Sequence, residues 1–391
     1  MKKQHLNVFL FLWGAIFAFI CFFPAITVLP LYVYELGGTE FDTGLQMILY
    51  FLAGVLFRFY FGPLTDKKGR KIPLMISAFV FATSSLLFII CKSVWFVALV
   101  RIYHAVGLAT IFSSGGALAV DLAPPNRVGV YIGIFRITFS VGLLTGPTLA
   151  MAIINSYSFQ VWFVVSFFIG MLSLILLALI KEPHHRPDDL KESGPFQMFG
   201  TVLKEKAAYP ALYGIALVSL VYGLLLTFVV LFVTQTTEIV NPGLYFTCFS
   251  IVAIVGNLTS GYLSDRWGRP VVVWPAIMFL GIGAGSLFFL PQTPVIFYLS
   301  SITAGLGYSG AMPSLAAWLV EVTNKDNRGT VLALQENVVD LSNGVASFVF
   351  GVLSGFLGMG LSFLFVGMTV FTLSLIKFLA FCSFRQALPH K

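Results

Sequence analysis

Charged side chains are scarce in this chain of 391 residues. Asp, Glu, Lys and Arg make up 10% of it, whereas hydrophobic residues make up 58%. A typical soluble domain carries about 25% charged residues. The scarcity of charge therefore excludes a water-soluble globule, and we expect an integral membrane protein whose solvent is the lipid bilayer.

Cysteines and catalytic motifs are also scarce. The four cysteines, Cys21, Cys91, Cys248 and Cys382, lie far apart and lack the paired spacing of a disulfide framework or a zinc site. The sequence has no nucleophile–base constellation, no HExxH-like pair and no Walker-type nucleotide loop. We therefore expect no metal site, no cofactor and no enzymatic activity, and nucleotide-driven pumping is disfavoured.

Basic residues are almost absent from every second loop between the apolar runs. These loops hold one base, Lys92, against the acids Glu35, Glu40, Asp42 and Glu238. The other loops hold most of the Lys and Arg residues and account for the net charge of +7. The positive-inside rule then places both termini in the cytoplasm of a multi-pass protein of a plasma (inner) membrane. The basic excess reflects orientation, and no nucleic acid partner is expected.

Long apolar runs make up most of the chain. A membrane-spanning helix needs about 20 largely apolar residues. The first run follows Lys2 and Lys3, is longer than the core of a signal peptide, and is expected to be retained. We predict an all-α protein with twelve spans at 8–33, 43–64, 72–91, 94–118, 128–152, 158–181, 209–235, 243–263, 271–290, 295–319, 329–356 and 360–384.

One long polar stretch, residues 182–208, separates six of these runs from the other six. We expect it to be a cytoplasmic linker between an N-terminal six-helix bundle, 1–181, and a C-terminal one, 209–391. Its later part has apolar residues at helical spacing beside Lys204 and Lys206. That pattern is compatible with an interfacial helix on the inner leaflet and equally with a plain linker.

A charged turn occurs twice in the chain. The segment Gly62–Lys71, which reads GPLTDKKGRK, recurs 199 residues later at Gly261–Pro270 as GYLSDRWGRP. Each copy follows a long apolar run and precedes another. The repeat predicts two pseudo-symmetric halves, an arrangement in which secondary transporters place the substrate site between the repeats near the bilayer midplane.

The acids and arginines of the repeated turns are expected to control conformation. An acid in each turn can face the positive N-terminal end of a neighbouring helix. Each arginine can pair with an acid at the end of the fourth span of its half. Contacts of this kind, broken on inward opening, would favour the outward-facing state. The expected gating residues are Asp66, Arg70, Asp121, Asp265, Arg269 and Glu321, with Arg70–Asp121 and Arg269–Glu321 as ion pairs.

The two turns resemble the loop 2–3 signature of the major facilitator superfamily and its degenerate second copy. The stretch Arg101–Gly107, RIYHAVG, is similar to the intramembrane arginine motif of the same family. In the fifth run, Gly133, Gly142, Gly146 and Pro147 match the glycine spacing of the signature associated with antiporters. Glycines at such spacing let another helix approach closely, and Pro147 can bend the helix.

The resemblance covers nearly the whole chain and is closest to bacterial exporters of drugs and metabolites, including metallophore-like compounds. It implies the twelve-helix major facilitator fold, alternating access between two rocking halves, and a gating role for Gly142, Gly146 and Pro147. Ala105 stands where a glycine is common, and Ala150 with Met151 replaces the usual glycine pair of the antiporter signature. These departures weaken the assignment as an antiporter more than the assignment to the superfamily.

Ionisable residues within the spans mark candidate functional positions. Asp340 lies near the middle of the eleventh span and is the first candidate for carrying the coupling proton, followed by Glu336 on roughly the same helix face. His104 is either a proton relay or a hydrogen-bonded structural histidine. Arg136 and Arg101 are candidates for binding anionic parts of a substrate. Alternatively, Arg136 is locked to Glu336 or Asp340 as a strut between the halves.

Polar and aromatic neighbours complete the predicted substrate-binding set, namely Phe135, Phe139, Gln335, Asn337 and Asn343. We predict proton-coupled export of a small organic molecule by antiport, with the proton gradient as the energy source. Proton-coupled import by symport and a non-transporting membrane sensor are the alternatives. No obligatory protein partner is evident, and a monomer is expected.

Overall fold

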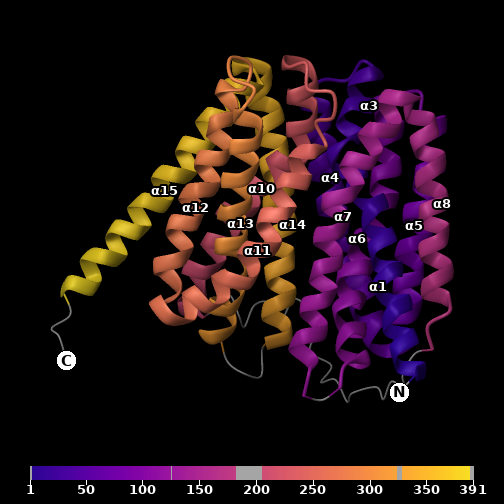
Figure 1. The fold of residues 1–391 in the computed structure, drawn as a ribbon, viewed down its shortest axis with the longest axis horizontal. Coiled ribbons are helices and arrows are strands. Elements are labelled where there is room, and N and C mark those ends of the chain that lie inside the picture. Colours follow the sequence, from indigo (N-terminus) through magenta and orange to yellow (C-terminus); the bar gives the residue numbers. More distant parts are fainter. Residues whose placement is uncertain (1, 125, 182–204, 324–327, 388–391) are drawn as a thin grey trace. The chain divides into compact units, whose positions relative to one another are not determined.

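The computed structural model describes residues 2–124, 126–181, 205–323 and 328–387, and within these ranges the chain forms helices and no strand. It divides into two compact units (Figure 1). The first comprises Met1–Glu192 together with Val240–Thr247, and the second comprises Ser193–Ile239 and Cys248–Lys391. Most of the linker predicted at 182–208, residues 182–204, lies outside the described residues.

The first unit contains the six spans predicted for the N-terminal half. Its helices are α1 (Lys2–Phe22), α2 (Pro24–Thr27), α3 (Leu29–Glu35), α4 (Glu40–Lys68), α5 (Lys71–Ile90), α6 (Val94–Leu122), α7 (Val128–Ser156) and α8 (Phe159–Ala178). The first span is three helices instead of the single one predicted. Proline lacks the backbone N–H that a helix interior needs, and Pro24 and Pro30 each lie in the first turn of the next helix.

The second unit contains the remaining six spans. Its elements are the 3₁₀ turn η1 (Lys206–Ala208), α10 (Tyr209–Thr236), α11 (Leu244–Trp267), α12 (Arg269–Ser286), the 3₁₀ turn η2 (Leu287–Phe289), α13 (Ile296–Glu321), α14 (Arg328–Leu357) and α15 (Met359–Ala387). The start of α11, up to Thr247, groups with the first unit. Every predicted span therefore coincides with a helix or, for the first span, a run of helices. The prediction of a twelve-helix membrane protein is confirmed.

Eleven helical stretches in the described ranges are long and apolar enough to cross a membrane. The helix α13 is not among them, because serines, glycines and Pro313 interrupt its apolar residues. The most enclosed span is α10, which is apolar on all sides and has 89% of its most apolar stretch buried. A helix of this kind occupies the core of a bundle.

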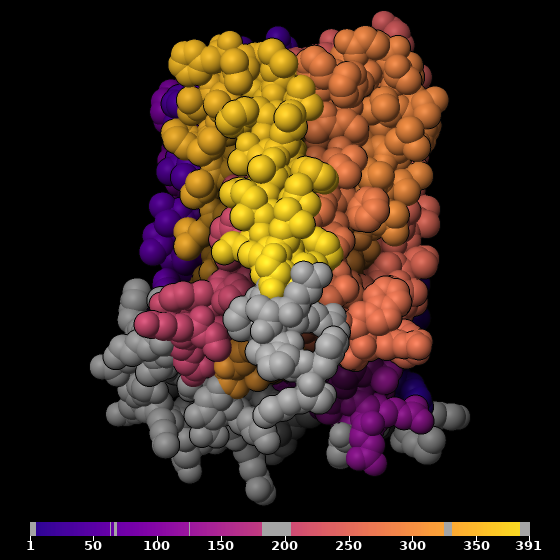
Figure 2. All heavy atoms as spheres, turned by 90° about the vertical axis from the view of Figure 1, so that its left-hand side faces the viewer, coloured from indigo at the N-terminus to yellow at the C-terminus, as the bar shows by residue number. Residues whose placement is uncertain are grey.

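At the surface of the second unit, α15 runs along α12 (Figure 2). It carries a row of exposed apolar side chains, including Leu361, Phe365, Met368 and Ile376. Such a face is costly in water and favourable against lipid acyl chains. The contrast between α10 and α15 shows which helices form the interior of this unit and which face lipid.

The repeated turns adopt the same local backbone. Gly69, between α4 and α5, and Gly268, between α11 and α12, both have φ of +94°. Glycine adopts positive φ without the steric cost that a Cβ atom brings. The two glycines therefore let each helix pair reverse within one or two residues, and they place Arg70 and Arg269 at equivalent positions after the turn.

Candidate functional site

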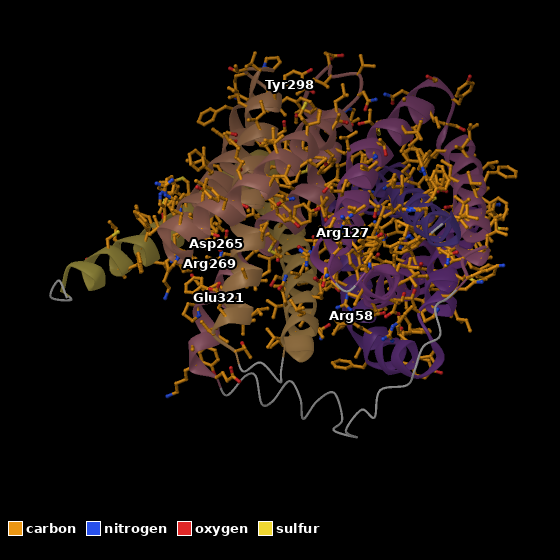
Figure 3. The ribbon with its side chains drawn as sticks, turned by 60° about the horizontal axis from the view of Figure 1, so that its bottom comes forward. Arg58, Arg127, Asp265, Arg269, Tyr298 and Glu321 are labelled. Carbon is orange, nitrogen blue, oxygen red and sulfur yellow. The ribbon has the colours of Figure 1, made fainter. Side chains whose placement is uncertain are left out.

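Arg269 holds the repeated turn of the second unit to the end of α13. Its guanidinium pairs with Glu321 through Nε to Oε2 at 3.2 Å and through Nη2 to Oε1 at 2.5 Å. Nη2 also lies 2.6 Å from an Asp265 carboxylate oxygen. Figure 3 shows these three side chains together at the opposite end of the second unit from Tyr298. The predicted ion pair between Arg269 and Glu321 is present, in two-pronged geometry that suits a planar guanidinium.

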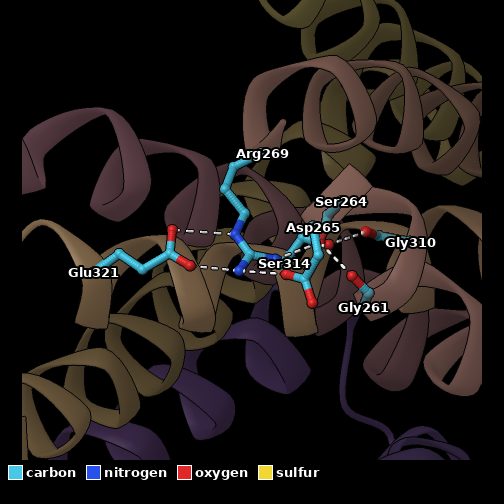
Figure 4. Close-up of polar contacts among 7 residues, drawn as sticks. All are labelled: Gly261, Ser264, Asp265, Arg269, Gly310, Ser314 and Glu321. Atoms are coloured by element: carbon cyan, nitrogen blue, oxygen red, sulfur yellow. Dashed lines mark hydrogen bonds and ion pairs between the residues drawn. The ribbon is translucent and has the colours of Figure 1, made fainter. Parts of the chain in front are cut away.

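A serine extends this network. Arg269 Nη1 donates to the Ser264 hydroxyl at 2.5 Å, and that hydroxyl in turn donates to the Gly261 carbonyl at 3.0 Å (Figure 4).

Glu321 is the last residue of α13 and is exposed. The hydrogen bonds from Arg269 lower the pKa of its carboxyl. The carboxylate therefore stays charged and paired at neutral pH.

The corresponding turn of the first unit has the equivalent pair at a longer distance. Arg70 Nε lies 3.5 Å from Asp121 Oδ2, so the predicted ion pair is present but longer. Arg70 also donates through Nη1 to the Thr65 carbonyl at 2.7 Å. The side chain of Asp66 lies outside the described residues, so its predicted gating contact stays a prediction. The two halves therefore share the arginine–acid pair, at a longer distance in the first unit.

Arg101 and His104 lie inside the first unit on α6. Arg101 is 2% exposed, its guanidinium carbon lies 5.7 Å from the ring centre of Tyr50, and its Nε has no hydrogen-bond partner in the described part of the chain. A cation above an aromatic face is attracted by the ring quadrupole. The ring of His104 lies 4.8 Å from that of Phe81 and 5.5 Å from that of Tyr50, centre to centre.

The polar residues predicted on the eleventh span lie on α14, and most of them are buried. Asp340 is 5% exposed, and Gln335, Asn337 and Asn343 are also buried, whereas Glu336 is half-buried. The side-chain oxygens of Gln335 and Asn343 have no hydrogen-bond partner among the described residues. Asp340 therefore lies within the protein.

Close packing joins α14 to α10. A Cβ atom added at Gly223 would lie 2.6 Å from the Asn343 Cα and 2.9 Å from its Oδ1. Ser347, one turn further along α14, forms a hydrogen bond of 2.9 Å with Thr227 of α10. The polar face of α14 is therefore held against the most enclosed helix of the unit.

The residues predicted on the fifth span lie on α7 in different surroundings. Phe135 is buried and stacks on Phe11 at 5.5 Å between ring centres. Phe139 is half-buried and makes an edge contact with Phe23 at 4.8 Å. Arg136 is exposed. Because Arg136 and α14 belong to different units, the predicted strut from Arg136 to Glu336 or Asp340 stays a prediction.

Two of the three glycines that match the antiporter spacing on α7 are sites of close helix approach. A Cβ atom at Gly142 would lie 2.3 Å from Phe19 Cβ, and one at Gly146 would lie 3.0 Å from the Ile20 carbonyl oxygen. Around Gly133 there is open space within 4 Å. The expectation that all three glycines admit a neighbouring helix is therefore wrong for Gly133. Pro147 is buried within α7, one residue after Gly146.

A polar seam that no sequence pattern predicts joins α7 to the segment 240–247 of the first unit. Thr148 and Thr247 share a hydroxyl–hydroxyl hydrogen bond of 2.7 Å, and Thr247 also donates to the Leu144 carbonyl at 2.8 Å. Asn241 donates to the Thr148 carbonyl at 3.1 Å, and Asn155 to the Val240 carbonyl. Asn and Thr residues at separate positions form no motif, so only the folded chain brings these partners together.

No group of three or more His, Cys, Asp or Glu side chains in the described ranges is placed to hold a metal ion. The four cysteines are all free thiols. The polar chemistry of the described chain is therefore that of buried acids, guanidiniums and amides in apolar helices.

A repeated six-helix pattern, matched turns and intramembrane charges define a transporter scaffold. A family model described as the Major Facilitator Superfamily matches residues 11–239 and 237–390. The chain belongs to this superfamily, and the resemblance stated from the sequence is confirmed.

Individual relatives are similar over most of the chain. The staphylopine export protein of Staphylococcus aureus strain Mu50 is 25% identical over 376 residues, which cover 92% of this chain and 93% of that protein. The multidrug resistance protein MdtG of Escherichia coli strain 536 is 24% identical over 349 residues, covering 85% and 83%.

Solved structures share the fold. The crystal structure of a bacterial homologue of the human lysosomal transporter Spinster, in an inward-facing and unoccupied conformation, has a TM-score of 0.78 at 16% identity. The match covers 100% of this chain and 98% of that one. At this identity the likeness shows the fold alone.

Proposed function

We propose that this major facilitator transporter exports a small organic molecule across the plasma (inner) membrane in exchange for protons. The observation that carries the proposal is Asp340, a carboxylic acid 5% exposed in a long apolar helix. Two relatives that match most of the chain are an export protein and a multidrug resistance protein. These names favour export as the direction.

The position of Asp340 suits a proton carrier. It lies twelve residues after the start of α14, or about 18 Å at 1.5 Å per residue, which is near the middle of a bilayer-spanning helix. An ionised carboxylate is costly away from water. Proton uptake and release at Asp340 should therefore follow the access of water as the transporter alternates. Glu336, one turn earlier and half-buried, is the second candidate.

The cargo that best fits the predicted binding residues is an anionic or zwitterionic metabolite. Arg136 is exposed, so its guanidinium is open to a carboxylate or phosphate group. Gln335 and Asn343 offer amide oxygens that no described residue uses, and these can accept hydrogen bonds from amino or hydroxyl groups of the cargo. A hydrophobic drug would instead use Phe135 and Phe139.

The test is transport by the purified protein in liposomes with an imposed pH gradient. We expect cargo to move against its own gradient when protons move the opposite way, and to stop when the pH gradient is collapsed. Cargo and protons moving in the same direction would establish symport instead. Flux that is independent of the gradient would reject proton coupling.

The proton carrier is tested by Asp340→Asn, which keeps the shape and removes the ionisable group. We expect proton-driven flux to fall at least about 100-fold, as for the loss of a group that moves a proton, while the protein remains folded and binds cargo. The matched variant Glu336→Gln should retain more activity. Normal export by Asp340→Asn would show that the assigned role is wrong.

A further inference from the structure

A small cavity lies inside the first unit, where the first span is broken. Its walls come from the helix interruption around Pro24 and from the helices α5, α6 and α8. The polar part of the lining is Cys21, Ser84, Ser85, His104 and Ser166, and the remainder is aromatic or aliphatic. The cavity leaves about 10 Å³ of space, which is about what one water molecule needs.

His104 is a polar group that needs a partner there. Its side chain is 2% exposed, and its contacts are the rings of Phe22, Phe81 and Tyr50. The described residues provide no hydrogen-bond partner for its ring nitrogens. A neutral imidazole has one N–H donor and one acceptor nitrogen. Leaving both unpaired away from water costs free energy.

The serine hydroxyls on the opposite wall have acceptor capacity to spare. Ser84 donates to the Phe81 carbonyl at 3.1 Å, and Ser85 donates to the same carbonyl at 3.0 Å. Ser85 and Ser166 are also hydrogen-bonded at 2.9 Å, and either hydroxyl can be the donor in that pair. A hydroxyl has two acceptor lone pairs. Ser84 and Ser166 can therefore each accept a further hydrogen bond.

The combination of size and chemistry selects one ligand. A buried water typically makes about three hydrogen bonds to otherwise unpaired polar groups, whereas purely apolar cavities stay dry. We propose that this cavity is a binding site for one ordered water molecule, which hydrogen-bonds to a ring nitrogen of His104 and to the serine hydroxyls of α5 and α8.

This water has a positioning role. It would join α6 to α5 and α8 through hydrogen bonds at the level where Pro24 interrupts the first span. Of the two roles predicted for His104, proton relay and structural histidine, the second would then apply. The water, and not the cargo, would hold its ring in place. The inference rests on geometry within the first unit and is independent of proton-coupled export.

The test is an experimental structure of the full chain in lipid nanodiscs, at a resolution that shows ordered waters. We expect a peak about 2.7–3.2 Å from a ring nitrogen of His104 and from at least one of the two serine hydroxyls. In His104→Phe the peak should disappear. In the control Ser173→Ala it should remain, since Ser173 is a buried serine of α8 that donates to the Gly14 carbonyl and does not line the cavity.

A second measurement needs only the wild-type protein, in case His104→Phe does not fold. In the wild-type structure, the density next to the ring of His104 is compared with the density of other buried waters. No peak there where other buried waters are visible, or a peak that survives His104→Phe, would each overturn the proposal.

Discussion

Two arginines in this protein are compensated in different ways. Arg269, at a helix start, meets two carboxylates and a hydroxyl. Arg101, deep within α6, has the face of Tyr50 beneath its guanidinium. The first arrangement could be predicted because the turn is repeated and an acid follows at the expected place. The second could not, since Tyr50 lies on α4 and aromatic residues make up 16% of the chain, so that no single ring stands out.

At this scale, Tyr50→Leu should destabilise the protein more than Tyr50→Phe. Leucine removes the aromatic face above which Arg101 lies, and such a desolvated interaction contributes about 0.5–2 kcal/mol. Phenylalanine keeps the face. The measurement is the apparent melting temperature of each variant in the same detergent. Equal melting temperatures would show that the ring face contributes nothing to holding Arg101.

Helices are the scale at which the sequence was most informative. Apolar runs and charged punctuation located all twelve spans, because a helix in lipid must satisfy its backbone internally over a fixed thickness. The apolar runs did not predict that the first span is divided into three helices. Pro24 and Pro30, which lie in the first turns of α2 and α3, are the residues from which the division could have been predicted. Of the α7 glycines, the pattern alone could not separate Gly133, in open space, from Gly142, in contact with Phe19.

That difference supplies a matched pair of substitutions on one helix. Gly142→Ala places a methyl group 2.3 Å from Phe19 Cβ, so α1 and α7 must move apart. Overpacking of this kind costs about 1–3 kcal/mol. Gly133→Ala meets no atom within 4 Å and should be neutral or slightly stabilising, because alanine favours helix over glycine.

Melting temperature and transport rate of both variants check this expectation. We expect Gly142→Ala to melt lower and to transport more slowly, and Gly133→Ala to match the wild type. A Gly133→Ala variant that loses transport while keeping its melting temperature would point to a role for open space at that position.

For the whole molecule, the duplicated turn made the two-unit organisation predictable, and the superfamily match agrees with it. The identity of the cargo was not predictable, because buried amides and arginines define a chemical class and not one compound. The membership of 240–247 in the first unit was also not predictable. Its eight residues are too few to show a periodic pattern, and their partners lie on α7, far earlier in the chain.

The turn of the second unit should matter more for transport than for stability. Glu321→Gln removes the charge that holds α12 to the end of α13, and exposed ion pairs contribute about 0–1 kcal/mol. We therefore expect a small change in melting temperature but a severalfold change in transport rate, since the pair is predicted to bias the alternation between states. The control is Asp121→Asn, whose ion pair with Arg70 is longer, at 3.5 Å. Equal effects of the two substitutions would contradict this difference between the units.

The seam between α7 and residues 240–247 has a consequence for biosynthesis. The ribosome completes α7 at Ser156 well before it reaches Thr247, so the side chains of Thr148 and Asn155 meet their partners in residues 240–247 only later. Residues 240–247, which group with the first unit, are therefore made only after α10, the first span of the second unit. A gene split at the apparent midpoint would yield a first fragment lacking that piece, whereas a split just after Thr247 would retain it.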